Sequence, residues 1–284
     1  MQVWVMEELE SSDIGDERLD QRFQLLLDTL SQRPSVSIPA ACNGWAETQA
    51  AYRFFGSDRV DEESVLYPHR QATLGRIEQH EIVLLVQDTT EIDVTRPEQQ
   101  MEGAGPLNDE AHLGFYDHVM LEVTPDRIPL GVVDVEIWAR DSEVFEENKK
   151  LGTQGKQNKR RKAPIEEKES FRWLNGYREA CAVAAETPQT TIVCISDSEG
   201  DIYECFAEAA TACNEGLPTA EWIGVLARIA AFPRPARIRI CRNFGRRWLR
   251  PKSVGLWKSR FRKTEHKVGM TANGSRRVPH GRQR

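Results

Sequence analysis

Apolar residues in the first 80 positions recur with the period of an α-helix. Between residues 16 and 31 they follow the i, i+4, i+7, i+8, i+11 spacing of one helical face, formed by Leu19, Phe23, Leu26, Leu27 and Leu30. The prolines at positions 34 and 39 are expected to end this helix, because proline has no amide hydrogen to donate. The pattern predicts further helices over 45–55 and from residue 61 onward, and therefore a small helical domain.

From residue 81 the pattern changes to short apolar runs bounded by polar residues. These runs predict buried or half-buried strands over 82–86, 116–123, 128–138 and 190–195. Helices are expected over 166–186 and 199–210, and the polar stretch 141–164 is expected to be a mobile loop. The order strand, strand, strand, helix, strand, helix is that of a ribonuclease-H-like α/β core with a mixed sheet.

The charges are divided unevenly along the chain. The whole sequence holds 38 lysines and arginines and 44 acids, a net charge of −6. Residues 222–284 contain 18 of these bases and a single acid, Glu265. No sustained apolar period organises this tail, so we expect residues 223–284 to be poorly ordered or disordered and to bind nucleic acid nonspecifically.

The remaining composition excludes several classes of protein. No run of about 18 apolar residues is present, which argues against a membrane-spanning helix. The six cysteines include no Cys-x-x-Cys pair, which argues against a zinc site. The first residues lack the basic-then-apolar order of a secretion signal, so a cytoplasmic location is expected.

Two aspartates are the candidate catalytic residues. Asp88 and Asp197 each follow an apolar run that predicts a strand. Carboxylates fixed at neighbouring strand ends could hold two divalent ions about 3.5–4 Å apart, as phosphodiester chemistry requires, and hard oxygen ligands suit Mg²⁺ or Mn²⁺. The alternative is that each aspartate only caps a turn or a helix.

Four stretches resemble the Tn-five-like, IS-four group of DDE transposases, within a similarity that runs over about 15–221. Residues 86–90 (Val-Gln-Asp-Thr-Thr) resemble its first aspartate motif, and 196–203 (Ser-Asp-Ser-Glu-Gly-Asp-Ile-Tyr) its second. Residues 167–170 (Glu-Lys-Glu-Ser), followed by Trp-Leu, match the helix before the second motif. Residues 50–55 (Ala-Ala-Tyr-Arg-Phe-Phe) resemble the amino-terminal DNA-binding domain of the group.

The resemblance implies a division of the chain and a reaction. It implies a helical DNA-binding domain over 1–80 and an incomplete ribonuclease-H-like catalytic core over 81–222. Asp88 and Asp197 would be the catalytic, metal-binding residues for two Mg²⁺ or Mn²⁺ ions. The expected reaction is cleavage and strand transfer at the terminal inverted repeats of a bacterial transposon, by a nucleoid-associated protein. A homodimer, or a complex with an intact transposase, is the expected partner state.

The third carboxylate of the family is missing. In the group it is a Glu in the pattern Tyr-x2-Arg-x3-Glu-x6-Lys, far beyond the second aspartate. Only 87 residues follow Asp197, and the residues at the corresponding positions around Glu265 are Lys258, Phe261 and Ala272. Together with the charge switch near residue 222, this mismatch suggests a shifted reading frame or a decayed gene, and hence a truncated protein with impaired activity.

Further residues complete the set of candidates. His118 lies where the family tends to place a histidine, although a structural role is the commoner one for such a residue. Glu199 and Asp201 follow the second aspartate closely and could support the metal ligands, but the expected role is to favour the start of the following helix. Candidate DNA contacts are Arg53, Arg59, Arg70, Arg76, Lys159, Arg160 and Arg161.

Two other functions stay open. One is a catalytically inactive protein that binds transposon ends and interferes with an intact transposase. The other is a ribonuclease-H-like nuclease that finds its third acid locally, among Glu199, Asp201 or Glu204.

Overall fold

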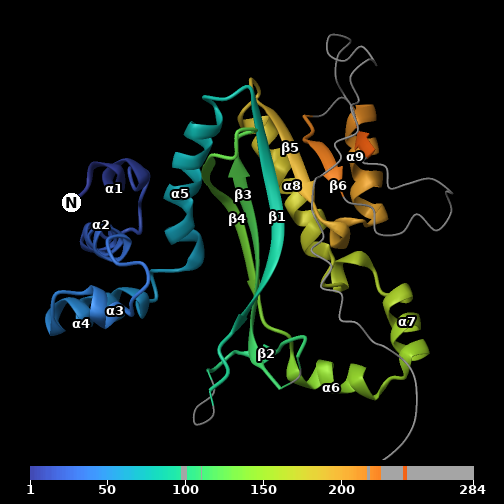
Figure 1. Cartoon of the computed structure of the whole chain (residues 1–284), viewed down its shortest axis with the longest axis horizontal. Coiled ribbons are helices and arrows are strands. Elements are labelled where there is room, and N and C mark those ends of the chain that lie inside the picture. The colour runs from blue at the N-terminus through green and yellow to red at the C-terminus, as the bar shows by residue number, and fades with distance from the viewer. Residues whose placement is uncertain (97–100, 110, 216–217, 225–238, 242–284) are drawn as a thin grey trace, which may run out of the picture. The chain divides into compact units, whose positions relative to one another are not determined.

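The computed structural model describes residues 1–96, 101–109, 111–215, 218–224 and 239–241 (Figure 1). Five helices open the chain: α1 (Val3–Glu8), α2 (Glu17–Ser31), α3 (Ile38–Ala41), α4 (Trp45–Phe55) and α5 (Glu62–Ile77). Among the described residues, no helix is long and apolar enough to cross a membrane.

The helices expected in the first 80 residues are confirmed. The range of α4 is the one that the periodicity predicts, and the side chain of Asp16 caps α2 by accepting a hydrogen bond from the Arg18 amide at 3.0 Å. Asp61 caps α5 in the same way. Helices α1 and α3 were not anticipated, because six and four residues are too short to show a helical period.

A separate hydrophobic core joins the first four helices. Its buried members are Val5, Leu9, Ile14, Phe23, Leu26, Cys42, Ala51 and Phe54. The rings of Phe23 and Phe54 stack with their centroids 5.6 Å apart, which joins α2 to α4.

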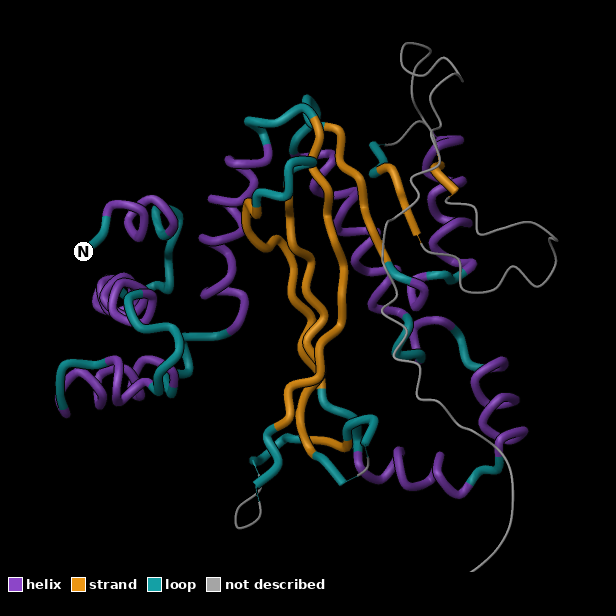
Figure 2. Tube along the Cα trace, in the orientation of Figure 1, coloured by secondary structure: helices purple, strands orange, loops and turns teal. Residues whose placement is uncertain are grey.

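A seven-stranded mixed sheet forms the second part of the fold (Figure 2). Its strands are β1 (Ile82–Asp93), β2 (Gly105–Pro106), β3 (Leu113–Val123), β4 (Pro129–Trp138), β5 (Thr191–Ser196), β6 (Glu221–Gly224) and β7 (Arg239–Cys241). Both β4 and β2 pair antiparallel with β3, and the order continues β3-β1-β5-β6-β7. Strands β1, β5 and β6 are parallel to one another. The chain therefore has a mixed α/β fold with a helical N-terminal region.

One face of the sheet packs against α8 (Phe171–Glu186), which follows the short helix η1 (Ile165–Glu167). Alternate residues of the central strands are buried there, including Val83 and Leu85 of β1 and Ile192 of β5. Tyr177, Ala180 and Val183 of α8 belong to the same core. The turn η2 (Ser198–Gly200) and α9 (Tyr203–Glu215) follow β5.

Two sequence predictions differ from the structure. Strand β1 continues to Asp93 because its second half pairs with β3, so Asp88 lies inside the strand and not at its end. The expected mobile loop over 141–164 is wrong, because it contains α6 (Ser142–Lys150) and α7 (Thr153–Lys162). Neither helix has a buried residue, which is why no apolar period revealed them.

The sheet continues beyond residue 222, where the sequence placed the end of the core. Strand β6 extends to Gly224, and β7 pairs antiparallel with it. The rest of the tail, for which disorder was expected, lies outside the described residues.

Candidate functional site

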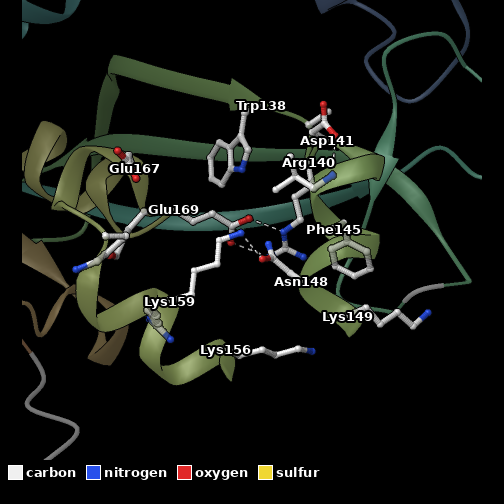
Figure 3. A pocket seen from close by; sticks show the side chains of 16 residues that line it. Trp138, Arg140, Asp141, Phe145, Asn148, Lys149, Lys156, Lys159, Glu167 and Glu169 are labelled. Carbon is white, nitrogen blue, oxygen red and sulfur yellow. Dashed lines mark hydrogen bonds and ion pairs between the residues drawn. The ribbon is translucent and has the colours of Figure 1, made fainter. Parts of the chain in front are cut away.

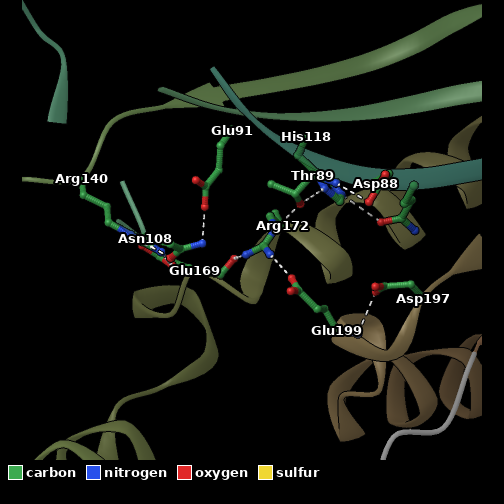
Figure 4. Close-up of polar contacts among 11 residues, drawn as sticks. Asp88, Thr89, Glu91, Asn108, His118, Arg140, Glu169, Arg172, Asp197 and Glu199 are labelled. Atoms are coloured by element: carbon green, nitrogen blue, oxygen red, sulfur yellow. Dashed lines mark hydrogen bonds and ion pairs between the residues drawn. The ribbon is translucent and has the colours of Figure 1, made fainter. Parts of the chain in front are cut away.

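Asp88 and Asp197 lie beyond the same end of the pairing between two adjacent parallel strands, β1 and β5. The parallel pairing of β1 with β5 runs from Ile82 beside Thr191 to Val86 beside Ile195. Asp88 follows the last paired residue of β1 by two positions, and Asp197 follows the last paired residue of β5 by two positions. Asp88 is still within β1, whereas Asp197 comes directly after the last residue of β5 and caps η2, so both aspartates lie just beyond the same end of the β1–β5 pairing. Figure 4 shows the two aspartates at the end of the polar cluster that is farthest from Arg140.

Both aspartates are exposed, and their described contacts are with nearby backbone amides. An Asp88 oxygen accepts from the Thr89 amide at 2.9 Å. An Asp197 oxygen accepts from the Glu199 amide at 2.7 Å and so caps η2. Within the described residues, neither carboxylate has a cationic side-chain partner. The capping role that the sequence left open is therefore real for Asp197, but it uses only one of its oxygens.

The chemistry of this pair suits a magnesium or manganese ion. Such hard cations prefer carboxylate oxygens, and Mg²⁺ is commonly held by one or two carboxylates together with water and phosphate oxygens. In the described part of the chain, no group of three or more His, Cys, Asp or Glu side chains is arranged to hold a metal ion. The two aspartates thus offer part of a coordination shell.

Arg172 of α8 joins the two segments that carry the aspartates. Its Nε donates to Thr89 Oγ1 at 2.8 Å, and one terminal nitrogen donates to a Glu199 carboxylate oxygen at 2.8 Å (Figure 4). The other terminal nitrogen donates to the Glu169 carbonyl at 2.6 Å. The side chain is only 10% exposed, and this burial lowers the pKa of Arg172, against the opposing effect of the Glu199 charge.

A chain of hydrogen bonds continues from Arg172 into the core. Because Thr89 Oγ1 accepts from Arg172, its hydrogen points to His118 Nδ1, 2.8 Å away. His118 Nε2 then donates to Gln87 Oε1 at 3.2 Å, and Gln87 Nε2 donates to Cys194 Sγ at 2.8 Å. Burial, together with the nearby charge of Arg172, lowers the pKa of His118 to about 4. His118 is therefore a buried, neutral member of this chain.

The three acids that the sequence proposed as local substitutes for the third carboxylate have different surroundings. Glu199 is paired with Arg172. Asp201 lies beside it in the lining of a cavity of about 970 Å³, together with Thr89 and Arg172. Glu204 is in the first turn of α9. The sequence missed Arg172, although it is the second residue after the Glu-Lys-Glu-Ser stretch at 167–170.

A groove beside this cluster is lined by α6, α7 and the end of β4. Its cavity measures about 680 Å³, and Figure 3 shows Lys156, Lys159 and Asn148 around it. Arg140 crosses the groove and forms an ion pair with Glu169, with a second contact of 2.8 Å between them. Lys159 Nζ donates to Asn148 at 2.7 Å, while Arg160 and Arg161 form no ion pair within the described residues.

The candidate DNA contacts of the helical region fall into two groups. Arg70 forms ion pairs of 2.7 Å with Glu179 and Glu186 of α8. Arg76 pairs with Glu8 of α1 at 2.7 Å and donates to the backbone of β4. These two arginines hold α5 in place.

The other two arginines point outward. Arg59 forms an ion pair of 3.6 Å with Asp16, but its side chain remains 63% exposed. Arg53 is exposed on α4 and makes no ion pair with any described residue. Their guanidinium groups therefore stay accessible to solvent.

A comparison with known protein families matches residues 1–60 to the transposase DNA-binding family. A comparison with curated proteins found no match. The matched segment contains α1 to α4 and ends before α5 begins. At its N-terminus the chain is thus similar to the DNA-binding domain of transposases, which supports a transposase or DNA-binding role.

Proposed function

We propose that the chain is a DDE-type transposase of the Tn-five-like, IS-four group, which cleaves and transfers phosphodiester bonds at transposon ends. The observation that carries the proposal is that Asp88 lies in β1 and Asp197 directly follows β5, its parallel neighbour, with no cationic side chain of the described residues bound to either. A divalent ion held there would activate water or a 3′-hydroxyl and stabilise the leaving oxygen.

The topology supports the ribonuclease-H-like part of the proposal. Three antiparallel strands precede a helix, a parallel strand and a second helix, as in that fold. Strand β5, which leads to Asp197, lies directly beside β1 in the sheet. The fold therefore provides the rigid support that two metal-binding carboxylates need.

The outer face of α4 is the DNA-contacting surface in this proposal. Trp45, Gln49, Tyr52 and Arg53 follow the i, i+4, i+7, i+8 spacing of one helical face, and Trp45 is 77% exposed. Trp45, Tyr52 and Arg53 are exposed and Gln49 is half-buried. Aromatic, amide and guanidinium groups of this kind can contact DNA bases and phosphates. The family match over 1–60 includes this helix.

The α7 cations form a second proposed DNA surface, near the segments that carry the aspartates. Arg160 and Arg161 line the same cavity as Thr89 and Glu199, the neighbours of the two aspartates. A phosphate backbone bound along α7 would therefore lie close to the proposed reaction centre. Arg70 and Arg76 are left out of this surface, because intramolecular carboxylates occupy their guanidinium groups.

A second function has its own observation in support. Because no third carboxylate joins Asp88 and Asp197 among the described residues, the chain could bind transposon ends without cutting them. Such a protein would compete with an intact transposase for the same DNA. The two functions share the α4 surface and differ only in cleavage.

A cleavage assay distinguishes these two functions. Its substrate is the genomic DNA on both sides of the gene, because that DNA would carry the terminal repeats. With Mn²⁺ present, the wild-type chain is expected to cut this DNA, and Asp88→Asn or Asp197→Asn to lower the rate by at least about a hundredfold. Asp126→Asn, an exposed change in the β3–β4 turn, is the matched control. Salt-sensitive binding without cleavage by the wild type would favour the second function.

A further inference from the structure

The two segments that carry the aspartates are joined through a single side chain. Asp88 precedes Thr89 on β1, and Glu199 follows Asp197 by two residues in η2. Arg172 binds the Thr89 hydroxyl and the Glu199 carboxylate at the same time, each at 2.8 Å. The direct β1–β5 pairing ends at Val86 and Ile195, so this bridge acts where the ladder no longer holds the strands together.

The surroundings fix the guanidinium of Arg172 in position. It lies 5.4 Å from the centre of the Trp138 ring and 5.5 Å from that of Trp173. The Glu169 carbonyl accepts another of its hydrogens at 2.6 Å. A planar fork held in this way can keep two partners at a constant separation, which a flexible lysine ammonium cannot do.

We propose that Arg172 is a positioning residue, which sets the separation of Asp88 and Asp197 so that the pair can bind a divalent cation. The inference rests on the proposed function, because it requires the two aspartates to share that cation. Arg172 acts through Thr89 and Glu199 and donates to neither aspartate. Outer groups that orient metal ligands commonly change the affinity by about tenfold to a hundredfold, and a loss of that size is expected here.

The test is Mn²⁺ binding by the full-length chain, measured by electron paramagnetic resonance titration. Arg172→Lys keeps the positive charge but cannot reach both partners, so its affinity for Mn²⁺ should fall at least about tenfold. Thr89→Val removes the hydroxyl that accepts from Arg172 while it keeps the shape of the side chain. Thr89→Ser keeps the hydroxyl, and it should bind Mn²⁺ like the wild type.

A matched control comes from the same helix. Arg178 of α8 also forms an ion pair with a carboxylate, Glu208, at 2.7 Å, but it contacts neither β1 nor η2. Arg178→Lys should leave the Mn²⁺ affinity unchanged. Thermal unfolding of each variant shows whether the fold is intact, and Thr89→Val keeps the test valid if Arg172→Lys unfolds.

The outcomes separate the inference from the function on which it rests. If the wild type binds Mn²⁺ through Asp88 and Asp197, but Arg172→Lys and Thr89→Val bind it equally well, Arg172 has no positioning role. If Asp88→Asn binds Mn²⁺ as tightly as the wild type, the proposed metal site itself is wrong and the inference falls with it. The inference is supported if Arg172→Lys and Thr89→Val both bind Mn²⁺ more weakly while Arg178→Lys and Thr89→Ser keep the wild-type affinity.

Discussion

Helices α5 and α7 both carry cations that the sequence marked as DNA contacts, but their surroundings differ. On α5, Arg70 lies between two carboxylates of α8, and Arg76 binds Glu8 of α1. On α7, Arg161 forms no ion pair with any described residue, and the helix has no buried side chain. Helix α5, by contrast, buries Leu74 and Ile77 in the core.

The difference shows that the number of cations on a helix does not locate a DNA surface. An arginine that lies between acids on neighbouring elements stabilises the fold, and its charge is already balanced. A cation without a carboxylate partner leaves its charge available for a phosphate. We therefore expect substitutions on α5 to change stability and substitutions on α7 to change DNA binding.

The largest expected effect concerns Glu122, a carboxyl on the α5 side of the sheet. Glu122 is fully buried, and this burial, reinforced by the charges of Asp134 and Glu179, raises its pKa to about 9. In the folded chain the Glu122 carboxyl therefore keeps its proton at a pH at which the same carboxyl in the unfolded chain has already lost it. The free energy of unfolding should fall between about pH 5 and pH 9, with a limiting slope of about 1.4 kcal/mol per pH unit.

Glu122→Gln should remove this slope and raise the free energy of unfolding at pH 8. Urea unfolding at pH 6, 7 and 8 measures both quantities. The control is Glu63→Gln, an exposed change in the first turn of α5 that should keep the wild-type slope. Equal slopes in the wild type and Glu122→Gln would show that Glu122 is not buried as a neutral acid.

Local periodicity explains which parts of this fold the sequence predicts. It predicted α2, α4 and α5, whose apolar residues face a core, and it predicted the apolar start of β1. It missed α6 and α7, because neither helix buries a residue. The second half of β1 was missed as well, since its polar residues form a strand only through pairing with β3.

The candidate site likewise contains some residues that the sequence predicts and others that it misses. Asp88 and Asp197 could be proposed because each follows an apolar run in its own segment. The Arg172–Glu199 pair could not, because its members are 27 residues apart and meet only after β5 has joined the sheet. For the same reason the sequence could not tell that acids of α8 and α1 occupy Arg70 and Arg76.

An intermediate effect is expected from Arg70→Ala. The change leaves Glu179 and Glu186 without their partner, and the Arg70 side chain is 22% exposed, so the loss of stability should be about 2 kcal/mol. The matched change on α7, Arg161→Ala, should cost less than about 0.5 kcal/mol. Urea unfolding measures both, and a larger loss for Arg161→Ala than for Arg70→Ala would contradict the contrast between the helices.

The smallest change in the free energy of unfolding is expected for substitutions on α7. Their effect should be on DNA binding alone. Arg160→Gln combined with Arg161→Gln should weaken binding to a short DNA duplex and reduce the slope of log K against log salt by about two, one for each lost phosphate contact. Fluorescence anisotropy between 50 and 200 mM salt measures this slope. Arg127→Gln combined with Arg178→Gln makes the same change in net charge at exposed or half-exposed sites away from α7. If this control lowers the slope equally, the overall charge of the chain governs DNA binding, whereas a change confined to the α7 variant places the phosphate backbone along that helix.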